Sequence, residues 1–445
     1  MSLLRKKIEQ EIRDRGPIPF SRYMELCLYD PELGYYSRNA QQFGKAGDFY
    51  TSSDVHAVFG RLLARQFDEM WRALGSPNHI ELIELGPGRG LFAQDVLAWS
   101  EKKFPDFFDA FRYVLIESSA ALRQQISETL KLHLDTGKVE FRTPEFLAAE
   151  PTSAAERRQN AAYGATRDYG AGEEQAPKAR QTTPADQLSA AGVPTIVFAN
   201  EFFDALPVEI LSTKGALRID TRDNRFLETW EPSSPDELEF LDRYSVHPEP
   251  GERVEVPLAA QQYINRIAAS IQRGFLVAID YGYTREEQLS GRHRGTLKAL
   301  RQHSLSANPY EAPGEQDITA DVNFTALAAA SQKNGMQAQK LVTQSQFLMG
   351  IGEANQFADA FEDCRLPQER AKVALQLKHL VTPAGMGESF HVLLADKGIE
   401  QEKVAALAGL NFGRMARPIA TAASGDPPEP ALSACNEPKG RSPAE

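Results

Sequence analysis

The chain has 445 residues and carries 61 Asp and Glu against 49 Lys and Arg, a formal net charge of -12 at pH 7. This acidic balance argues against a general binder of nucleic acid or of acidic membranes. No apolar run approaches the roughly 20 residues that a membrane-spanning helix needs. The cysteines Cys27, Cys364 and Cys435 are scattered, so we expect neither a disulfide framework nor a metal site.

The N-terminal sequence predicts the compartment. Residues 1–7 lead straight into Glu9, Glu11 and Asp14, without the apolar stretch of a signal peptide. Mitochondrial presequences avoid acidic residues, which this segment contains. Together with the unpaired thiols, these features predict a reducing cytoplasmic location.

Apolar residues at helical spacing predict helices over 3–15, 20–29 and 55–74. Between the last two lies a glycine-rich, aromatic stretch, 43–52, which fits neither a regular element nor an idle linker. We interpret residues 1–75 as an N-terminal helical arm.

A strand-like run, 80–85, ends abruptly at Gly86, Gly88 and Gly90, and a helical segment follows. A strand, a glycine turn and a helix are how a doubly wound α/β sheet presents its backbone to a nucleoside cofactor. The spacing is GxGxG, which differs from the GxGxxG of dinucleotide binders. The motif suits a cofactor without a pyrophosphate, such as S-adenosylmethionine, although an ordinary tight turn would show the same glycines.

The next strand, 111–116, ends at Glu117. A carboxylate at this position can accept hydrogen bonds from both ribose hydroxyls in dehydrogenases and in methyltransferases. The alternative is a solvated glutamate at a strand end. These two motifs predict a cofactor-binding fold and leave the kind of cofactor open.

Two stretches have a composition that cannot bury enough apolar surface to offset the entropy of ordering. Residues 150–190 are rich in Ala, Arg, Gln and Gly, and we interpret them as a disordered spacer rather than a partner-binding segment. Residues 411–445 are rich in Pro, Ala, Gly and Ser and are predicted to be a disordered tail.

The remaining elements complete an α/β sheet. Further strands are predicted at 195–199, 275–279, 337–343 and 389–395, and helices at 261–272 and 321–332. Short β-prone runs over 209–260, split by polar turns, indicate an inserted smaller lobe. We therefore predict a seven-stranded Rossmann-like sheet, with the main domain over 76–410. Four polar or glycine-containing segments directly follow predicted strands, so we expect them at one edge of that sheet. They are the glycine turn, Glu117, 200–204 and 280–282.

Several motifs in fixed order resemble the MidA family of methyltransferases. They are Gly16–Phe20, Tyr29–Pro31, Gly34–Tyr36, Gly47–Ser52, Phe59–Gly60, Glu84–Gly90, Asn200–Val208, Asp280–Tyr283 and Asp317–Thr325. The resemblance runs from about Gly16 to Asp396. It implies a class I fold and S-adenosylmethionine as the cofactor. The family includes the mitochondrial protein arginine methyltransferase that assists assembly of respiratory complex I.

The resemblance also implies roles for individual residues. The cofactor-binding set would be Asp48, Glu84, Gly86, Gly88, Gly90 and Glu117. We expect the turn at Asp48 to fold over the cofactor and offer its carboxylate to the amino group, unless that turn is only structural. The slot after the fourth strand, which orients the acceptor in methyltransferases, holds Asn200 and Glu201.

An arginine acceptor needs carboxylates that fix its plane and hold one nitrogen towards the methyl group. Glu201 and Asp204 could form that clamp, with Asn200 beside them as a third candidate catalytic residue. For Asn200 or Asp204 the alternative is a cap on a following helix.

The resemblance thus implies a methyltransferase that acts on a protein arginine, and by the same analogy a subunit of NADH:quinone oxidoreductase is the expected client. An alternative is an assembly factor that binds S-adenosylmethionine without catalysis. A third reading, an NAD-dependent oxidoreductase, conflicts with the GxGxG spacing. The sequence does not predict the oligomeric state.

Overall fold

The computed structural model describes residues 2–38, 57–143, 192–223, 225–301, 304–306 and 308–412. Asp48 and its glycine-rich turn, the predicted spacer at 150–190 and the tail beyond residue 412 lie outside the described residues. The described residues belong to one compact unit, Met1–Phe412.

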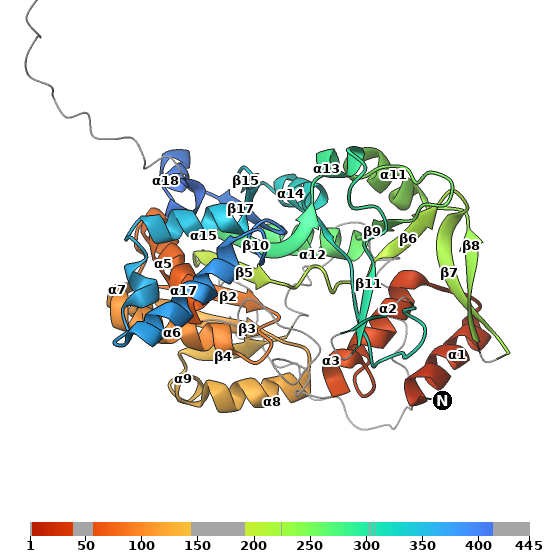
Figure 1. Ribbon diagram of the computed structural model, residues 1–445, viewed down its shortest axis with the longest axis horizontal. Helices are drawn as coiled ribbons and strands as arrows, with labels where there is room; N and C mark the ends of the chain where they lie inside the picture. Colours follow the sequence, from red (N-terminus) through yellow and green to blue (C-terminus); the bar gives the residue numbers. More distant parts are fainter. Residues whose placement is uncertain are drawn as a thin grey trace, which may run out of the picture. The chain divides into compact units, whose positions relative to one another are not determined.

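A mixed sheet forms the centre of this unit (Figure 1). Its long strands are β2 (Ile80–Leu85), β3 (Phe111–Ile116), β4 (Val139–Arg142), β5 (Thr195–Asn200), β10 (Gly274–Tyr283) and β17 (Phe390–Lys397). The order is β15-β17-β10-β5-β2-β3-β4, and only β17 runs antiparallel to its neighbour β10 among these six. The strand order reverses between β2 and β5, which is where an open α/β sheet binds ligands.

The sheet has nine strands, so the predicted count of seven was wrong. The stretch predicted as one strand, 337–343, forms two short pieces, β15 (Gln337–Ala338) and β16 (Val342–Thr343), and both pair with β17. A third short strand, β14 (Val322–Asn323), pairs with the end of β10. Local periodicity cannot reveal such two-residue pairings because partners far away in sequence decide them.

Helices cover both faces of the sheet, so its strands are buried on both sides. One layer contains α5 (Ala57–Ala73), α6 (Leu91–Lys103), α7 (Pro105–Ala110), α15 (Gln344–Glu353) and α17 (Pro367–Val381). The other contains α12 (Leu258–Ser270) and α14 (Phe324–Lys333). Neighbouring strand residues alternate between the layers: Leu82 packs in the first core and Ile83 in the second.

A second sheet forms the smaller lobe, with strand order β1-β7-β6-β9 and β8 paired to β7. Its strands are β1 (Ile18–Pro19), β6 (Glu209–Ser212), β7 (Gly215–Arg222), β8 (Arg225–Glu231) and β9 (Val254–Val256), with α11 (Pro235–Tyr244) beside them. Ile18 pairs with Ile219, and α1 (Leu3–Arg15) and α2 (Phe20–Tyr29) share a core with this sheet (Figure 1). The start of the predicted arm therefore packs on the lobe, whereas α5 packs on the main sheet.

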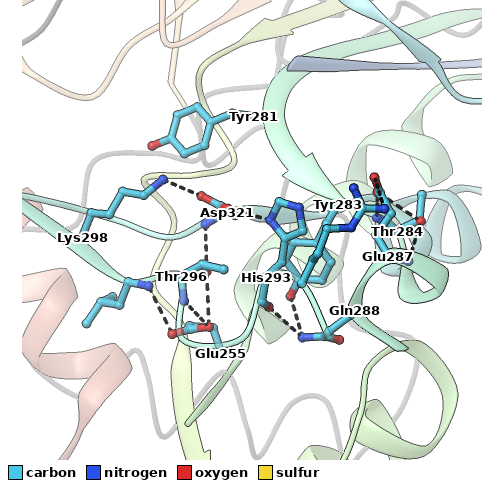
Figure 2. Close-up of polar contacts among 12 residues, drawn as sticks. Glu255, Tyr281, Tyr283, Thr284, Glu287, Gln288, His293, Thr296, Lys298 and Asp321 are labelled. Atoms are coloured by element: carbon cyan, nitrogen blue, oxygen red, sulfur yellow. Dashed lines mark hydrogen bonds and ion pairs between the residues drawn. The ribbon is translucent and has the colours of Figure 1, made fainter. Parts of the chain in front are cut away.

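The remaining elements are short. They are α3 (Tyr35–Arg38), α8 (Ala120–Thr129), α9 (Lys131–Asp135), α13 (Arg285–Leu289), α16 (Ala358–Phe361), α18 (Gln401–Ala405), the 3-10 helix Ala408–Leu410 and the small sheet β11 (Lys298–Arg301), β12 (Ser304–Ser306) and β13 (Asp317–Thr319). Figure 2 shows how Thr296 and Asp321 tie the segment before β11 to Glu255 of β9. In the described part of the chain, no helix has the length and apolarity to cross a bilayer.

Candidate functional site

A cavity of about 610 Å³ lies beyond the carboxyl ends of β2, β3 and β5 and reaches the second sheet. Its lining includes the predicted site residues Glu84, Gly86, Gly88, Glu117, Asn200, Glu201 and Asp204. The predicted set therefore converges on one cavity, except for Asp48, outside the described residues, and Gly90, which is absent from the lining.

The glycine turn owes its shape to left-handed backbone. Gly86, Gly88 and Gly90 have φ values of 62°, 54° and 75°, a region that other residues adopt only at a cost. A Cβ on Gly86 would lie 2.9 Å from Phe202 Cδ2, whereas one on Gly88 would meet no protein atom within 4 Å. Gly90 is the N-cap of α6 and packs against Ile126, which is a structural role. Because Gly88 has no side chain, the space beside it in the cavity stays open to a ligand.

Glu117 is buried at the tip of β3, with 7% of its surface exposed. Its Oε1 accepts a hydrogen bond from the backbone N–H of Ser119 at 2.7 Å. Burial raises the pKa of Glu117 to about 7, against the opposing effect of the backbone donors. A buried carboxylate with its orientation fixed from one side suits a ligand that brings two hydroxyl donors.

Glu84 is the last acidic residue before the glycine turn. It is almost completely buried, and the hydroxyl of Tyr113 donates to its Oε2 at 2.8 Å. Burial raises the pKa of Glu84 to about 8. Burial therefore disfavours the charged form of this carboxyl unless a cation or another donor lies beside it.

Glu201 has left-handed backbone, with φ of 49°. Its N–H donates to the carbonyl of Ile279 at 2.9 Å, and the Asn200 side-chain amide donates to Glu201 Oε1 at 3.1 Å. A glutamate held in this region of backbone space is strained, and such strain concentrates at functional sites. The left-handed conformation at Glu201 turns the chain away from the sheet directly after β5, at the point where Glu201 lines the cavity.

Asp204 does not cap a helix, so that alternative is excluded: in the described stretch 192–223, turns lead from β5 directly into β6. The turn is held from a distance by Asp280 of β10, which is fully buried. Asp280 Oδ2 accepts hydrogen bonds from the backbone N–H groups of Phe202 at 3.1 Å, Phe203 at 3.0 Å and Asp204 at 3.4 Å. Asp280 thus accepts hydrogen bonds from the backbone of this turn in the way that an N-cap residue accepts them from the first turn of a helix.

The side chain of Asp204 is buried and half satisfied. The hydroxyl of Tyr281 donates to its Oδ2, while Oδ1 has no hydrogen-bond partner among the described residues. Burial raises the pKa of Asp204 to about 6, and the Tyr281 hydrogen bond opposes that rise. Asp204 thus lines the cavity, while its Oδ1 is an enclosed oxygen without a donor, a feature that calls for a structural or functional explanation.

Sequence reasoning missed part of the lining. Ser21, Glu25 and Tyr29 lie on one face of α2, since they are four residues apart, and all three line the cavity together with Glu209 of β6. The hydroxyl of Tyr29 donates to the carbonyl of Ala205 at 2.9 Å. The i, i+4 spacing was visible in the sequence, but nothing there indicated that the helix faces the tip of β5.

A smaller cavity of about 390 Å³ lies on the other side of Tyr281 and is lined by His293, Lys298 and Asp321. Asp321 accepts from Lys298 at 2.8 Å and lies 3.1 Å from His293 Nδ1 (Figure 2). Within the described ranges, no group of His, Cys, Asp and Glu side chains could hold a metal ion.

Residues 62–342 match the model of a family of S-adenosyl-L-methionine-dependent methyltransferases, Methyltransf_28. The chain is 29% identical over 416 residues to the protein arginine methyltransferase NDUFAF7 homolog, mitochondrial, of Drosophila melanogaster, covering 89% of this chain and 85% of that protein. It is 27% identical over 394 residues to the human protein arginine methyltransferase NDUFAF7, mitochondrial, covering 86% and 80%. The predicted cytoplasmic location was wrong on this finding, since these relatives are mitochondrial. The prediction rested on the acidic residues Glu9, Glu11 and Asp14 and on the unpaired thiols, and these features do not decide between two reducing compartments.

Two solved structures have the same fold. A COG1565 superfamily member from Burkholderia thailandensis, bound to S-adenosyl-homocysteine, gives a TM-score of 0.68 at 25% identity and covers 91% of this chain and 94% of that one. Another COG1565 superfamily protein from that organism gives 0.67 at 24% identity, covering 92% and 94%. The α/β methyltransferase fold and the S-adenosylmethionine cofactor are thereby confirmed.

Proposed function

Because this chain belongs to the S-adenosyl-L-methionine-dependent methyltransferase family, we propose that it methylates an arginine side chain of a protein. The names of the relatives support the acceptor type. The observation that carries the proposal is that one cavity contains both the glycine turn with Glu117 and the half-satisfied carboxylate of Asp204.

The cofactor end of the cavity fits a nucleoside with a cationic tail. Glu117 would accept the ribose hydroxyls, Gly88 would let the ligand approach the backbone, and Glu84 would face the positive charge. When bound, S-adenosylmethionine supplies an electrophilic methyl group. Gly86 and Gly90 act indirectly, by letting the turn form. Asp48 is proposed to cover the cofactor from the arm.

At the other end, the carboxylates would hold the acceptor. A guanidinium has a pKa above 12 and is a poor nucleophile while its charge is delocalised. The Asp204 carboxylate would accept from one nitrogen, and Glu201, oriented by Asn200, from another. Two carboxylates fix the plane of the guanidinium and favour charge on the nitrogens that do not react. Correct positioning supplies most of the acceleration in such a displacement.

The protein client is proposed from the family. A subunit of respiratory complex I is the expected substrate, as the resemblance implies. In this proposal the lobe at 209–260 contacts the client. Carboxylates outnumber cations in the cavity lining, where Arg89 and Arg266 are the cations. An acidic cavity suits a basic acceptor.

Methylation of the cellular proteome tests the proposal. Cells with and without the gene are compared by mass spectrometry, and we expect one arginine to lose the mass of its methyl groups in the deletion strain. The same purified protein should methylate that arginine in vitro. A protein that restores client assembly without any methyl transfer would instead be an assembly factor that only binds S-adenosylmethionine.

A further inference from the structure

One tight turn between α2 and α3 contains two sequence motifs, Tyr-Asp-Pro and Gly-Tyr-Tyr, to which the proposed function gives no role. Asp30 Oδ1 accepts hydrogen bonds from two backbone N–H groups of this turn, at 3.2 Å and 3.0 Å. A Cβ on Gly34 would lie 2.5 Å from the backbone nitrogen of Asp30, so a side chain would not fit there. The turn thus brings Tyr29 and Tyr36 together, and their ring centroids lie 5.5 Å apart.

Tyr36 connects this turn to the cofactor end of the cavity. The hydroxyl of Ser119 donates to the backbone carbonyl of Tyr36 at 2.9 Å. The backbone N–H of Ser119 donates to Oε1 of Glu117 at 2.7 Å, and the Ser119 hydroxyl caps α8 by accepting from the N–H of Leu122. Figure 1 accordingly shows α3 between α2 and α8. Ser119 is absent from the cavity lining, so its contact with Glu117 is its link to the cofactor.

Two further contacts connect the side chain of Tyr36 to the acceptor end of the cavity. Its hydroxyl donates to Oδ1 of Asp317 on β13 at 2.9 Å. Ala320, directly after that strand, donates its N–H to the carbonyl of Asp204 at 3.0 Å. The ring of Tyr36 packs on Tyr29, whose hydroxyl binds the next carbonyl after that of Asp204 at 2.9 Å. Two routes from Tyr36 therefore reach the backbone of the Asp204 turn.

We propose that Tyr36 is a positioning residue that couples the two ends of the cavity: cofactor bound at Glu117 orders the Asp204 turn, so the client binds after the cofactor. This inference rests on the proposed function for the places of the two ligands and goes beyond it in linking them. A ribose bound to Glu117 restrains that carboxylate, and Ser119 and Tyr36 transmit the restraint to the turn. Because the turn is then already ordered, the client loses less conformational entropy, and the two ligands bind cooperatively.

Hydrogen exchange of the Asp204 turn tests the proposal without a client. Exchange of the backbone amides at 202–206 is measured by mass spectrometry with and without S-adenosylhomocysteine, at a concentration that calorimetry shows to be saturating. We expect the ligand to slow this exchange in the wild type, and Tyr36→Leu to lose about fivefold or more of that slowing, the lower end of typical coupling between two sites. Contacts that the ligand makes directly with the turn remain in the variant, so they do not account for the loss.

Tyr310→Leu is the matched control. The Tyr310 hydroxyl also donates to a carboxylate at 2.9 Å, that of Glu228, and the Tyr310 ring packs on Tyr23 with the centroids 5.3 Å apart. Tyr310 does not line the cavity. We expect this variant to keep the ligand-dependent slowing at 202–206 even where its stability falls.

Ser119→Ala breaks the route at its other end and provides a second variant if Tyr36→Leu fails to fold. It should lose the slowing as well, whereas Ser119→Thr keeps the hydroxyl and should restore it. Slowing that is unchanged in the folded variants of Tyr36 and Ser119, an equal loss in Tyr310→Leu, or no slowing in the wild type would overturn the inference. Slowing that depends on Tyr36, in a protein that transfers no methyl group to arginine, would support the inference and contradict the proposed function.

Discussion

Tyr281 of β10 donates its hydroxyl hydrogen to Asp204 Oδ2, so the strand next to β5 fixes the carboxylate that closes the acceptor end of the cavity. Asp280, the preceding residue, binds the backbone of the same turn. Two adjacent residues of β10 thus hold the side chain and the main chain of one turn. Oδ1 of Asp204 is enclosed and has no hydrogen-bond partner among the described residues.

Tyr281→Phe should leave cofactor affinity unchanged and move the pH dependence of methyl transfer. The lost hydrogen bond stabilised the anion, so the pKa of Asp204 rises above its present value of about 6. If the anion holds the acceptor, the acidic limb of the pH–rate profile moves to higher pH. Tyr283→Phe is the control, since that hydroxyl contacts Gln288 instead (Figure 2). An unmoved limb would show that Asp204 does not act as the anion.

Gly88→Val should abolish binding of S-adenosylmethionine. A Cβ at Gly88 would meet no protein atom within 4 Å, so the branched side chain would occupy space along the cavity lining. Left-handed backbone adds a stability loss of about 1–2 kcal/mol. Gly137→Val separates the two effects, because Gly137 has φ of 72°, equally open surroundings and no contact with the cavity. Calorimetry and thermal unfolding of both variants check this, and equal cofactor affinity in both would contradict it.

The elements that local patterns specify were predicted well from the sequence. The strand at 80–85 and its glycine turn were found because periodicity and the φ requirement act within a few residues. The pairing of β1 with β7 was not foreseen, since it joins Ile18 to Ile219 across some two hundred residues. Only tertiary packing decides that contact.

The same limit applies to the site. Glu117 was identified by its position at a strand end, and the cavity includes it. The sequence left a helix cap at Asp204 as an alternative, because Asp280, which binds the backbone of this turn, is 76 positions away. Tyr281 belongs to the motif 280–283, but no role for its side chain could be predicted. That role comes from the contact of its hydroxyl with Asp204, which only the fold brings about.

Protein stability should fall as the pH rises from about 5 to 8, and Glu84→Gln should reduce that fall. Burial raises the pKa of Glu84 from 4.5 to about 8 in the folded chain. The folded state therefore binds a proton that the unfolded state has lost, so its contribution is full below pH 4.5 and is lost as the pH rises through the folded pKa. A pKa difference of one between the folded and unfolded chain corresponds to about 1.4 kcal/mol in the free energy of unfolding.

Urea unfolding at both pH values measures this effect. Glu128→Gln is the control, because Glu128 is exposed on α8. The free energy of unfolding of Glu128→Gln should depend on pH as that of the wild type does. If the free energy of unfolding of Glu84→Gln falls with pH as steeply as that of the wild type, the pKa of Glu84 is not raised by burial.

Glu201→Gln tests the carboxylate clamp. The amide keeps the shape of the side chain and removes the charge that a guanidinium requires. We expect near-normal affinity for S-adenosylmethionine and a methyl-transfer rate lower by about 100-fold or more, the scale for one charge-stabilising group. Asp204→Asn should also slow transfer, with Tyr281 still able to donate to the remaining oxygen.

The most direct measurement is single-turnover transfer of a labelled methyl group from S-adenosylmethionine to an arginine-containing client peptide. It is run with the wild type and Glu201→Gln at equal cofactor saturation, followed by analysis of the labelled amino acid. The account predicts label on an arginine nitrogen in the wild type and its near absence in the variant. Bound cofactor without label on arginine in the wild type, or full transfer by Glu201→Gln, would contradict it.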